Sequence, residues 1–133
     1  MQITSDTGPK ISARLAERWG SSVISDGFQM VPHQFLKSQG LLGLTDSEMM
    51  VLLNVLDYWW ATDRLPFPST RTLARRMGCT ERKVQRHLAA LVKKRYLSRS
   101  QRAGSFAKEY DLSALIARLT SIVKGQTIAS AEQ

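Results

Sequence analysis

Three side chains in the middle of the chain carry hydrogen-bonding groups that can distinguish base pairs, namely Arg82, Gln85 and Arg86. Arginine can donate two parallel hydrogen bonds to guanine, and glutamine can pair with adenine in a similar way. The apolar residues Val84 and Leu88 lie among them at helical spacing, so a helix that buries these two leaves the three polar side chains pointing outward. We therefore expect base readout at Arg82, Gln85 and Arg86. The alternative is that they are ordinary solvated residues of a helix surface.

A second, larger set of residues is suited to contact the phosphates of a nucleic acid. Helix N-termini attract anions because their first backbone N–H groups have no partner within the helix. Thr70 and Arg71 are expected at such a position, and polar caps and basic residues surround them in the sequence. The predicted backbone contacts are Ser69, Thr70, Arg71, Arg75, Thr80, Lys83, Arg99, Arg102 and Lys108. One arginine of the pair Arg75-Arg76 is expected instead to face the preceding helix. Its candidate partner there is an aspartate, Asp57 or Asp63.

The positive charge of the chain is concentrated in one third of its length. Of the net charge of +8, the segment from Arg64 to Lys108 carries +12, because it holds 13 arginine and lysine residues and one acid, Glu81. The rest of the chain has a net charge of −4. Ordinary protein surfaces intersperse the two signs of charge, so this segment indicates a face that binds a polyanion.

Two short helices joined by a tight turn must position these side chains. Ser69 can cap a helix over residues 70–77, and Gly78 can close it. Thr80 can cap the next helix, which carries the candidate base-reading residues. Because only Gly78 and Cys79 separate the two helices, they must cross steeply, as in a helix-turn-helix.

A long helix is expected before this pair. Thr45 and Glu48 form a capping box at its start, and its apolar stripe continues to Trp59 and Trp60 before the prolines of residues 65–68 break it. The helix is expected to be covered on two sides. The two tryptophans could stack on exposed bases, but their spacing favours packing in the core.

A hairpin and a second amphipathic helix are expected after the pair. Residues 98–102 and 105–110 flank Ala103-Gly104, which favours a β-hairpin with glycine in the turn. The final helix is expected to end at Gly125, and it can pack either on its own domain or on the same helix of a second copy. Its apolar stripe, the predicted interface of a homodimer, consists of Leu112, Leu115, Ile116, Leu119, Ile122 and Val123.

The order of these elements predicts a mainly α protein with a small β-hairpin wing, a winged helix-turn-helix. Residues 1–26 are expected to form an N-terminal tail and short helix, residues 27–110 the winged domain, and residues 111–133 a C-terminal amphipathic helix and tail. A short strand is expected at residues 28–31, followed by a helix that begins at Pro32 and stops at Gly40.

The same region resembles the winged helix-turn-helix domains of plasmid and phage replication proteins and related bacterial regulators. The resemblance is carried by the cap Pro68-Ser69, the helix Leu-Ala-Arg-Arg-Met-Gly at residues 73–78 and the phrase Arg95-Tyr96-Leu97, and GFQMVPHQFL upstream extends it to residues 27–110. It implies this fold and DNA binding. Domains of this type serve replication initiation, transcriptional control and partition alike.

The remaining chemistry-bearing residues are sparse. Cys79, His33 and His87 lack metal-ligand spacing, and no catalytic triad, phosphate-binding glycine loop or nuclease carboxylate cluster occurs, so we expect neither an enzyme nor a cofactor. One cysteine and the absence of a long apolar run favour a cytoplasmic protein without a membrane contact. The predicted function is sequence-specific binding of double-stranded DNA as a dimeric transcriptional regulator. The alternatives are a plasmid or phage replication or maintenance protein, and a protein-interaction winged helix.

Overall fold

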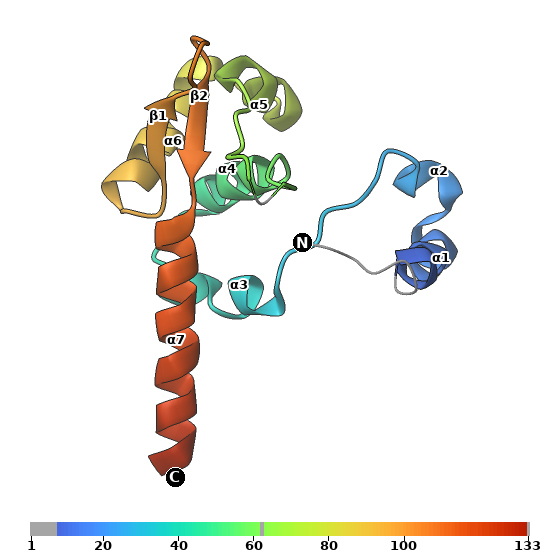
Figure 1. Ribbon diagram of the computed structural model, residues 1–133, viewed down its shortest axis with the longest axis vertical. Coiled ribbons are helices and arrows are strands. Elements are labelled where there is room, and N and C mark those ends of the chain that lie inside the picture. The colour runs from blue at the N-terminus through green and yellow to red at the C-terminus, as the bar shows by residue number, and fades with distance from the viewer. Residues whose placement is uncertain (1–7, 62, 133) are drawn as a thin grey trace. The chain divides into compact units, whose positions relative to one another are not determined.

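The chain divides between Val31 and Pro32 into two units, which are described separately (Figure 1). The computed structural model describes residues 8–61 and 63–132. The division lies five residues after the boundary expected at residues 26 and 27, and the C-terminal helix belongs to the second unit together with the rest of residues 32–133.

The N-terminal unit contains helix α1, Gly8–Trp19, and the single turn α2, Ser21–Ile24. Gly20 separates them with a φ of 85°, a conformation that favours glycine over any residue with a Cβ. The strand expected at residues 28–31 is not formed. A strand needs a neighbour for its backbone hydrogen bonds, and the sheet of the described residues contains only two strands, both in the second unit.

The second unit begins with helix α3, His33–Lys37, and a short 3-10 turn η1, Gln39–Leu41, followed by α4, Asp46–Leu56. The capping box of α4 is confirmed: the Glu48 backbone N–H donates to Thr45 Oγ1 at 3.1 Å, and the Thr45 N–H donates to Glu48 Oε1 at 2.8 Å. The helix pair follows as α5, Thr70–Met77, and α6, Glu81–Lys93. The side chains that close the core between these three helices are fully buried: Val51, Leu52, Val55, Leu73, Val84, Leu88 and Leu91.

Helix α4 ends at Leu56, whereas its apolar stripe was expected to continue to Trp59 and Trp60. Trp59 is half-buried and Trp60 is 75% exposed, so the expectation that both pack in the core is wrong for Trp60. Because the helix ends four residues before Trp60, the helical stripe of buried positions does not extend to it. Beyond the helix end, Arg76 of α5 donates to Asp57 Oδ2 at 2.9 Å and stacks on the Tyr58 ring at 4.7 Å. This contact holds the chain beside α5 directly after α4 ends.

The wing is an antiparallel hairpin of β1, Ser98–Gln101, and β2, Lys108–Asp111. Gly104 occupies its turn with a φ of 72°, as the sequence predicts. The Tyr110 N–H also donates to the Pro66 carbonyl at 2.9 Å, so the segment before α5 runs beside β2. Three helices followed by this hairpin form the winged helix-turn-helix that the sequence predicts.

Helix α7, Ser113–Glu132, continues past Gly125, where the sequence analysis expected it to end. A single glycine within a helix costs only about 1 kcal/mol, and no proline follows it. Leu112, Leu115 and Ile122 are buried within the second unit itself, which leaves little of the expected dimer interface free. No helix in the described ranges combines the length and the apolar character that crossing a membrane requires.

The C-terminal end of α6 is fastened to the start of α4. Lys94 Nζ donates to Glu48 Oε1 and, at 3.1 Å, to the Gly43 carbonyl. The Tyr96 hydroxyl donates to the Leu42 carbonyl at 2.6 Å within the core. Burial of Glu48 opposes its ionisation, but the hydrogen bonds from Lys94 and Thr45 outweigh it and lower the pKa of this carboxyl below its ordinary value. These bonds fix the direction in which α6 presents its outer face.

Candidate nucleic-acid interface

Helix α6 presents a continuous polar face to solvent. Thr80 caps the helix by accepting a hydrogen bond from the Lys83 N–H at 3.2 Å. Because Val84 and Leu88 face the core, the spacing of 3.6 residues per turn leaves the other side to Arg82, Gln85 and Arg86, and all three are exposed. The structure therefore brings the three candidate base-reading residues onto one face. Lys83, a predicted phosphate contact, is exposed beside them.

The N-terminus of α5 is more constrained than the sequence suggests. Ser69 Oγ accepts from the Thr72 N–H at 3.0 Å, which confirms the cap. The Thr70 hydroxyl donates to Glu81 Oε1 at 3.2 Å, so it is already engaged, and the carboxylate of Glu81 adds a negative charge at this helix start. Arg71 is exposed and is the cation here that can reach a phosphate.

The two arginines at the end of α5 have different roles. Arg76 is paired with Asp57, as expected for one member of the pair. Arg75 is exposed and stays a candidate for a phosphate contact. Figure 1 shows α5 and the tip of the hairpin at the same end of the second unit. A duplex that meets α6 in its major groove therefore has the positive charges of both α5 and the hairpin nearby.

The hairpin contributes two free cations and one stacked cation. Arg99 and Lys108 are exposed on its two strands, whereas the Arg102 guanidinium lies 3.9 Å from the centre of the Phe67 ring. Burial raises the pKa of Tyr110, which lies opposite Arg99 in the register, although the positive charge of Arg99 acts in the other direction. The stacking on Phe67 sets the direction of the Arg102 guanidinium.

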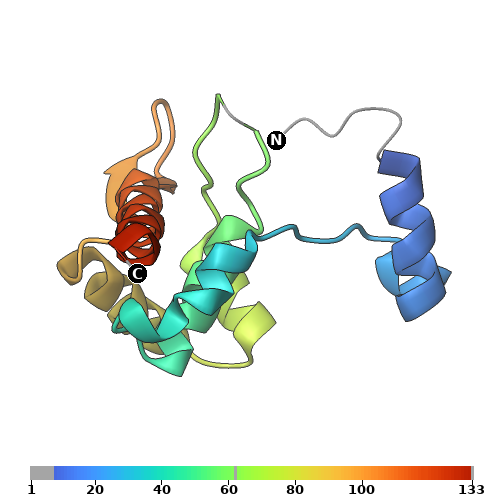
Figure 2. The ribbon, with the colours of Figure 1, turned by 90° about the horizontal axis from the view of Figure 1, so that it is seen from below.

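Between α4 and α5 lie Trp60, which the sequence favoured for the core over stacking on bases, and Arg64 and Phe67, to which the sequence assigned no role. Figure 2 shows this segment and the hairpin tip projecting from the same side of the second unit. Trp60, 75% exposed, and Phe67, 37% exposed, line a shallow hollow together with Arg64. The available signal in the sequence was the density of aromatic residues at positions 58–67, where Phe67 lies between Pro66 and Pro68, two prolines that exclude a helix.

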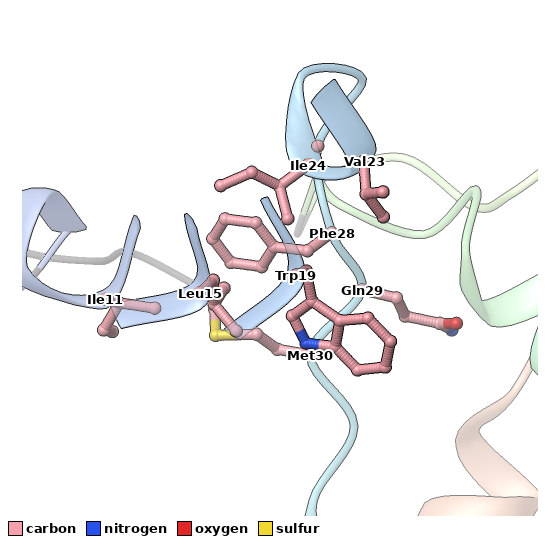
Figure 3. Close-up of a pocket in the computed structure, with 9 residues that line it drawn as sticks. Ile11, Leu15, Trp19, Val23, Ile24, Phe28, Gln29 and Met30 are labelled. Atoms are coloured by element: carbon pink, nitrogen blue, oxygen red, sulfur yellow. The ribbon is translucent and has the colours of Figure 1, made fainter. Parts of the chain in front are cut away.

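The N-terminal unit has an apolar groove of about 400 Å³. Figure 3 shows Trp19, Phe28 and Met30 gathered between α1 and the segment that follows α2, with Leu15 beside them. Trp19 is 56% exposed, and Val23 at the groove is 66% exposed. By contrast, Ile116 and Val123 are the members of the expected α7 interface that stay exposed.

Comparisons with known proteins give one family. Residues 31–130 match the model of the DnaD N-terminal domain. The chain is also similar to the crystal structure of the N-terminal domain of the DnaD protein from Geobacillus kaustophilus HTA426, with 22% sequence identity and a TM-score of 0.65 over 91% of this chain and 97% of that one. No curated protein matches the chain significantly.

Proposed function

Since the chain belongs to the family of DnaD N-terminal domains, we propose that it binds double-stranded DNA as a component of DNA replication. The family is related to replication, which favours the replication alternative of the sequence analysis. It gives no support to a transcriptional regulator, and a plasmid or phage origin is likewise unsupported.

The observation that carries the proposal is the outer face of α6. Arg82, Gln85 and Arg86 are exposed together, whereas the acid at the helix start, Glu81, is engaged by Thr70. Seated in a major groove, this face offers two bidentate donors for guanine and one amide for adenine. Arg71, Arg75, Lys83, Arg99 and Lys108 surround it as exposed candidates for phosphate contacts, and Arg102 joins them in its stacked position.

Replacing Arg86 and replacing Arg71 should have different effects. We expect Arg86→Ala to reduce discrimination between duplex sequences by roughly 1–3 kcal/mol at one position, because a base contact is lost. Arg71→Ala should weaken binding to all duplexes alike, because phosphates carry no sequence information. Duplexes selected from a random pool, followed by competition titrations with each variant, measure both quantities.

The matched control is Arg118→Ala, which removes the same charge from an exposed position of α7 outside the basic region. It should leave both affinity and discrimination close to wild type. If Arg86→Ala and Arg71→Ala lose affinity and discrimination in equal proportion, the division into base and phosphate contacts is wrong. If the wild-type chain binds no duplex, the winged helix serves protein interaction instead.

We further propose that the chain self-associates through the apolar groove of its N-terminal unit, in place of the α7 stripe. Family members are known for self-oligomerisation, and exposed apolar side chains are more numerous at the groove than on α7. Val23→Glu should weaken the dimer by about tenfold or more, since it introduces a charge into the interface. Ile116→Glu should leave it unchanged. Sedimentation equilibrium over a range of concentrations measures the dimer dissociation constant of each variant. If Ile116→Glu weakens the dimer and Val23→Glu does not, the interface lies on α7.

A further inference from the structure

Exposed aromatic rings and arginines form a connected surface beside the wing. Its members, called here the aromatic surface, are Trp60, Arg64, Phe67, Arg102 and Phe106. Phe106 at the hairpin tip is 96% exposed, and Trp60 is 75% exposed. Large exposed rings that gather in one patch, rather than singly, make this surface a candidate for contact with a ligand.

Contacts between the loop and the hairpin join these side chains into one surface. Trp60, Arg64 and Phe67 line one hollow, and Arg102 and Phe106 line another, open hollow of about 470 Å³ at the hairpin tip. The 3.9 Å stacking of Arg102 on Phe67 connects the two. The hydrogen bond of 2.9 Å from the Tyr110 N–H to the Pro66 carbonyl keeps the loop beside β2.

The charge of this surface is positive. Residues 99–108 of the hairpin contain Arg99, Arg102 and Lys108 and no acid. Residues 58–68 of the loop contain one acid, Asp63, next to one base, Arg64. The two acids of the hairpin, Glu109 and Asp111, lie at the end of β2 that is distant from the turn, so the part of the hairpin near Phe106 carries positive charge, which complements a phosphate backbone.

We propose that the aromatic surface binds single-stranded DNA, with unpaired bases stacked on Trp60 and Phe106 and the backbone held by Arg64 and Arg102. Bases in a duplex already stack on each other, so a protein ring finds a free base face only on an unpaired strand. Rings interleaved with arginines match the alternation of bases and phosphates along such a strand. An apolar protein partner would instead leave these arginines desolvated and unpaired.

The proposal rests on the proposed DNA-binding function but uses residues other than the outer face of α6. A replication component that holds both a duplex and an unpaired strand would sit at a junction between the two. Arg102 is a candidate contact for both kinds of strand, so the test uses Trp60 and Phe106, which belong to the aromatic surface alone.

The test measures fluorescence anisotropy of a labelled oligothymidylate of about 20 nucleotides and of a labelled blunt duplex of the same length, with the full chain. Trp60→Ala and Phe106→Ala are each expected to weaken oligothymidylate binding about tenfold relative to duplex binding, within the range for removal of one stacked base. Trp60→Phe and Phe106→Trp keep a ring and should retain most of the affinity. Met50→Ala, at an exposed apolar position of α4, is the control and should change neither affinity.

Several outcomes would overturn the proposal. If the wild-type chain binds the duplex but not oligothymidylate, the aromatic surface does not bind single strands and the proposed function survives. If it binds neither, both proposals fail. If the alanine variants bind oligothymidylate as tightly as wild type, or weaken duplex binding equally, or if the ring-retaining variants lose as much affinity as the alanine variants, base stacking at this surface is refuted. Circular dichroism shows whether each variant keeps its fold.

Discussion

Raising the salt concentration from about 50 mM to about 200 mM should weaken duplex binding by this chain roughly a thousandfold. The expectation follows from the exposed cations of α5, α6 and the hairpin, since contact with about six phosphates releases condensed counterions and gives a slope near −5 in a plot of log affinity against log salt. Titrations of one labelled duplex at several salt concentrations measure this slope directly.

The same salt titrations show which cations contact phosphates. Replacing Arg71, Lys83 and Lys108 together by alanine should make the slope shallower by nearly three, because each phosphate contact contributes about 0.9. Arg118→Ala should leave the slope unchanged, because Arg118 lies on α7, away from the basic segment. A wild-type affinity that hardly responds to salt would mean that the exposed positive charge does not meet a polyanion.

Leu88→Ala should destabilise the second unit by about 3 kcal/mol and lower its Tm by roughly 10–20 °C. Leu88 is completely buried between α6 and the helices it packs on, so truncation removes apolar contacts and leaves a cavity. Urea unfolding followed by circular dichroism gives the free energy of unfolding. DNA affinity should fall at temperatures where the variant unfolds and should be near wild type well below them.

The control for this prediction is Leu36→Ala, the same change at a position that is 53% exposed. It should alter the free energy of unfolding by no more than about 0.5 kcal/mol. Equal destabilisation by both changes would show that Leu88 is not at the centre of the core, and would contradict the packing of α6 described above.

Local signals explain why the helix-turn-helix could be predicted. The hydroxyls of Ser69 and Thr80 satisfy backbone donors three residues further on, and Gly78 adopts a φ of 65° at the end of α5. Each of these interactions lies within a few residues, so the identity of the residue is enough to predict it. The same holds for Gly104 in the turn of the hairpin.

Apart from the helix end expected at Gly125, which is a local feature, the expectations that the structure contradicts concern interactions between distant segments. Trp60 is exposed because α4 ends at Leu56, where the following residues contact Arg76 of α5 instead of continuing the helix. Residues 28–31 have the composition of a strand but no neighbouring strand. For the last helix the sequence left packing on its own domain and packing on a second copy both open, and the structure buries Leu115 and Ile122 within their own unit.

The winged helix and its outward-facing Arg82, Gln85 and Arg86 were thus determined by the sequence alone, because helical periodicity and caps act within one or two turns. The tertiary structure decided which cations are free, since Arg76 is paired with Asp57 and Lys94 with Glu48, while Arg71 stays exposed. It also decided that Trp60 and Phe106 face solvent and that Arg102 stacks on Phe67. Those outcomes depend on contacts between segments that are distant in the sequence, and residue spacing along the chain carries little information about such contacts.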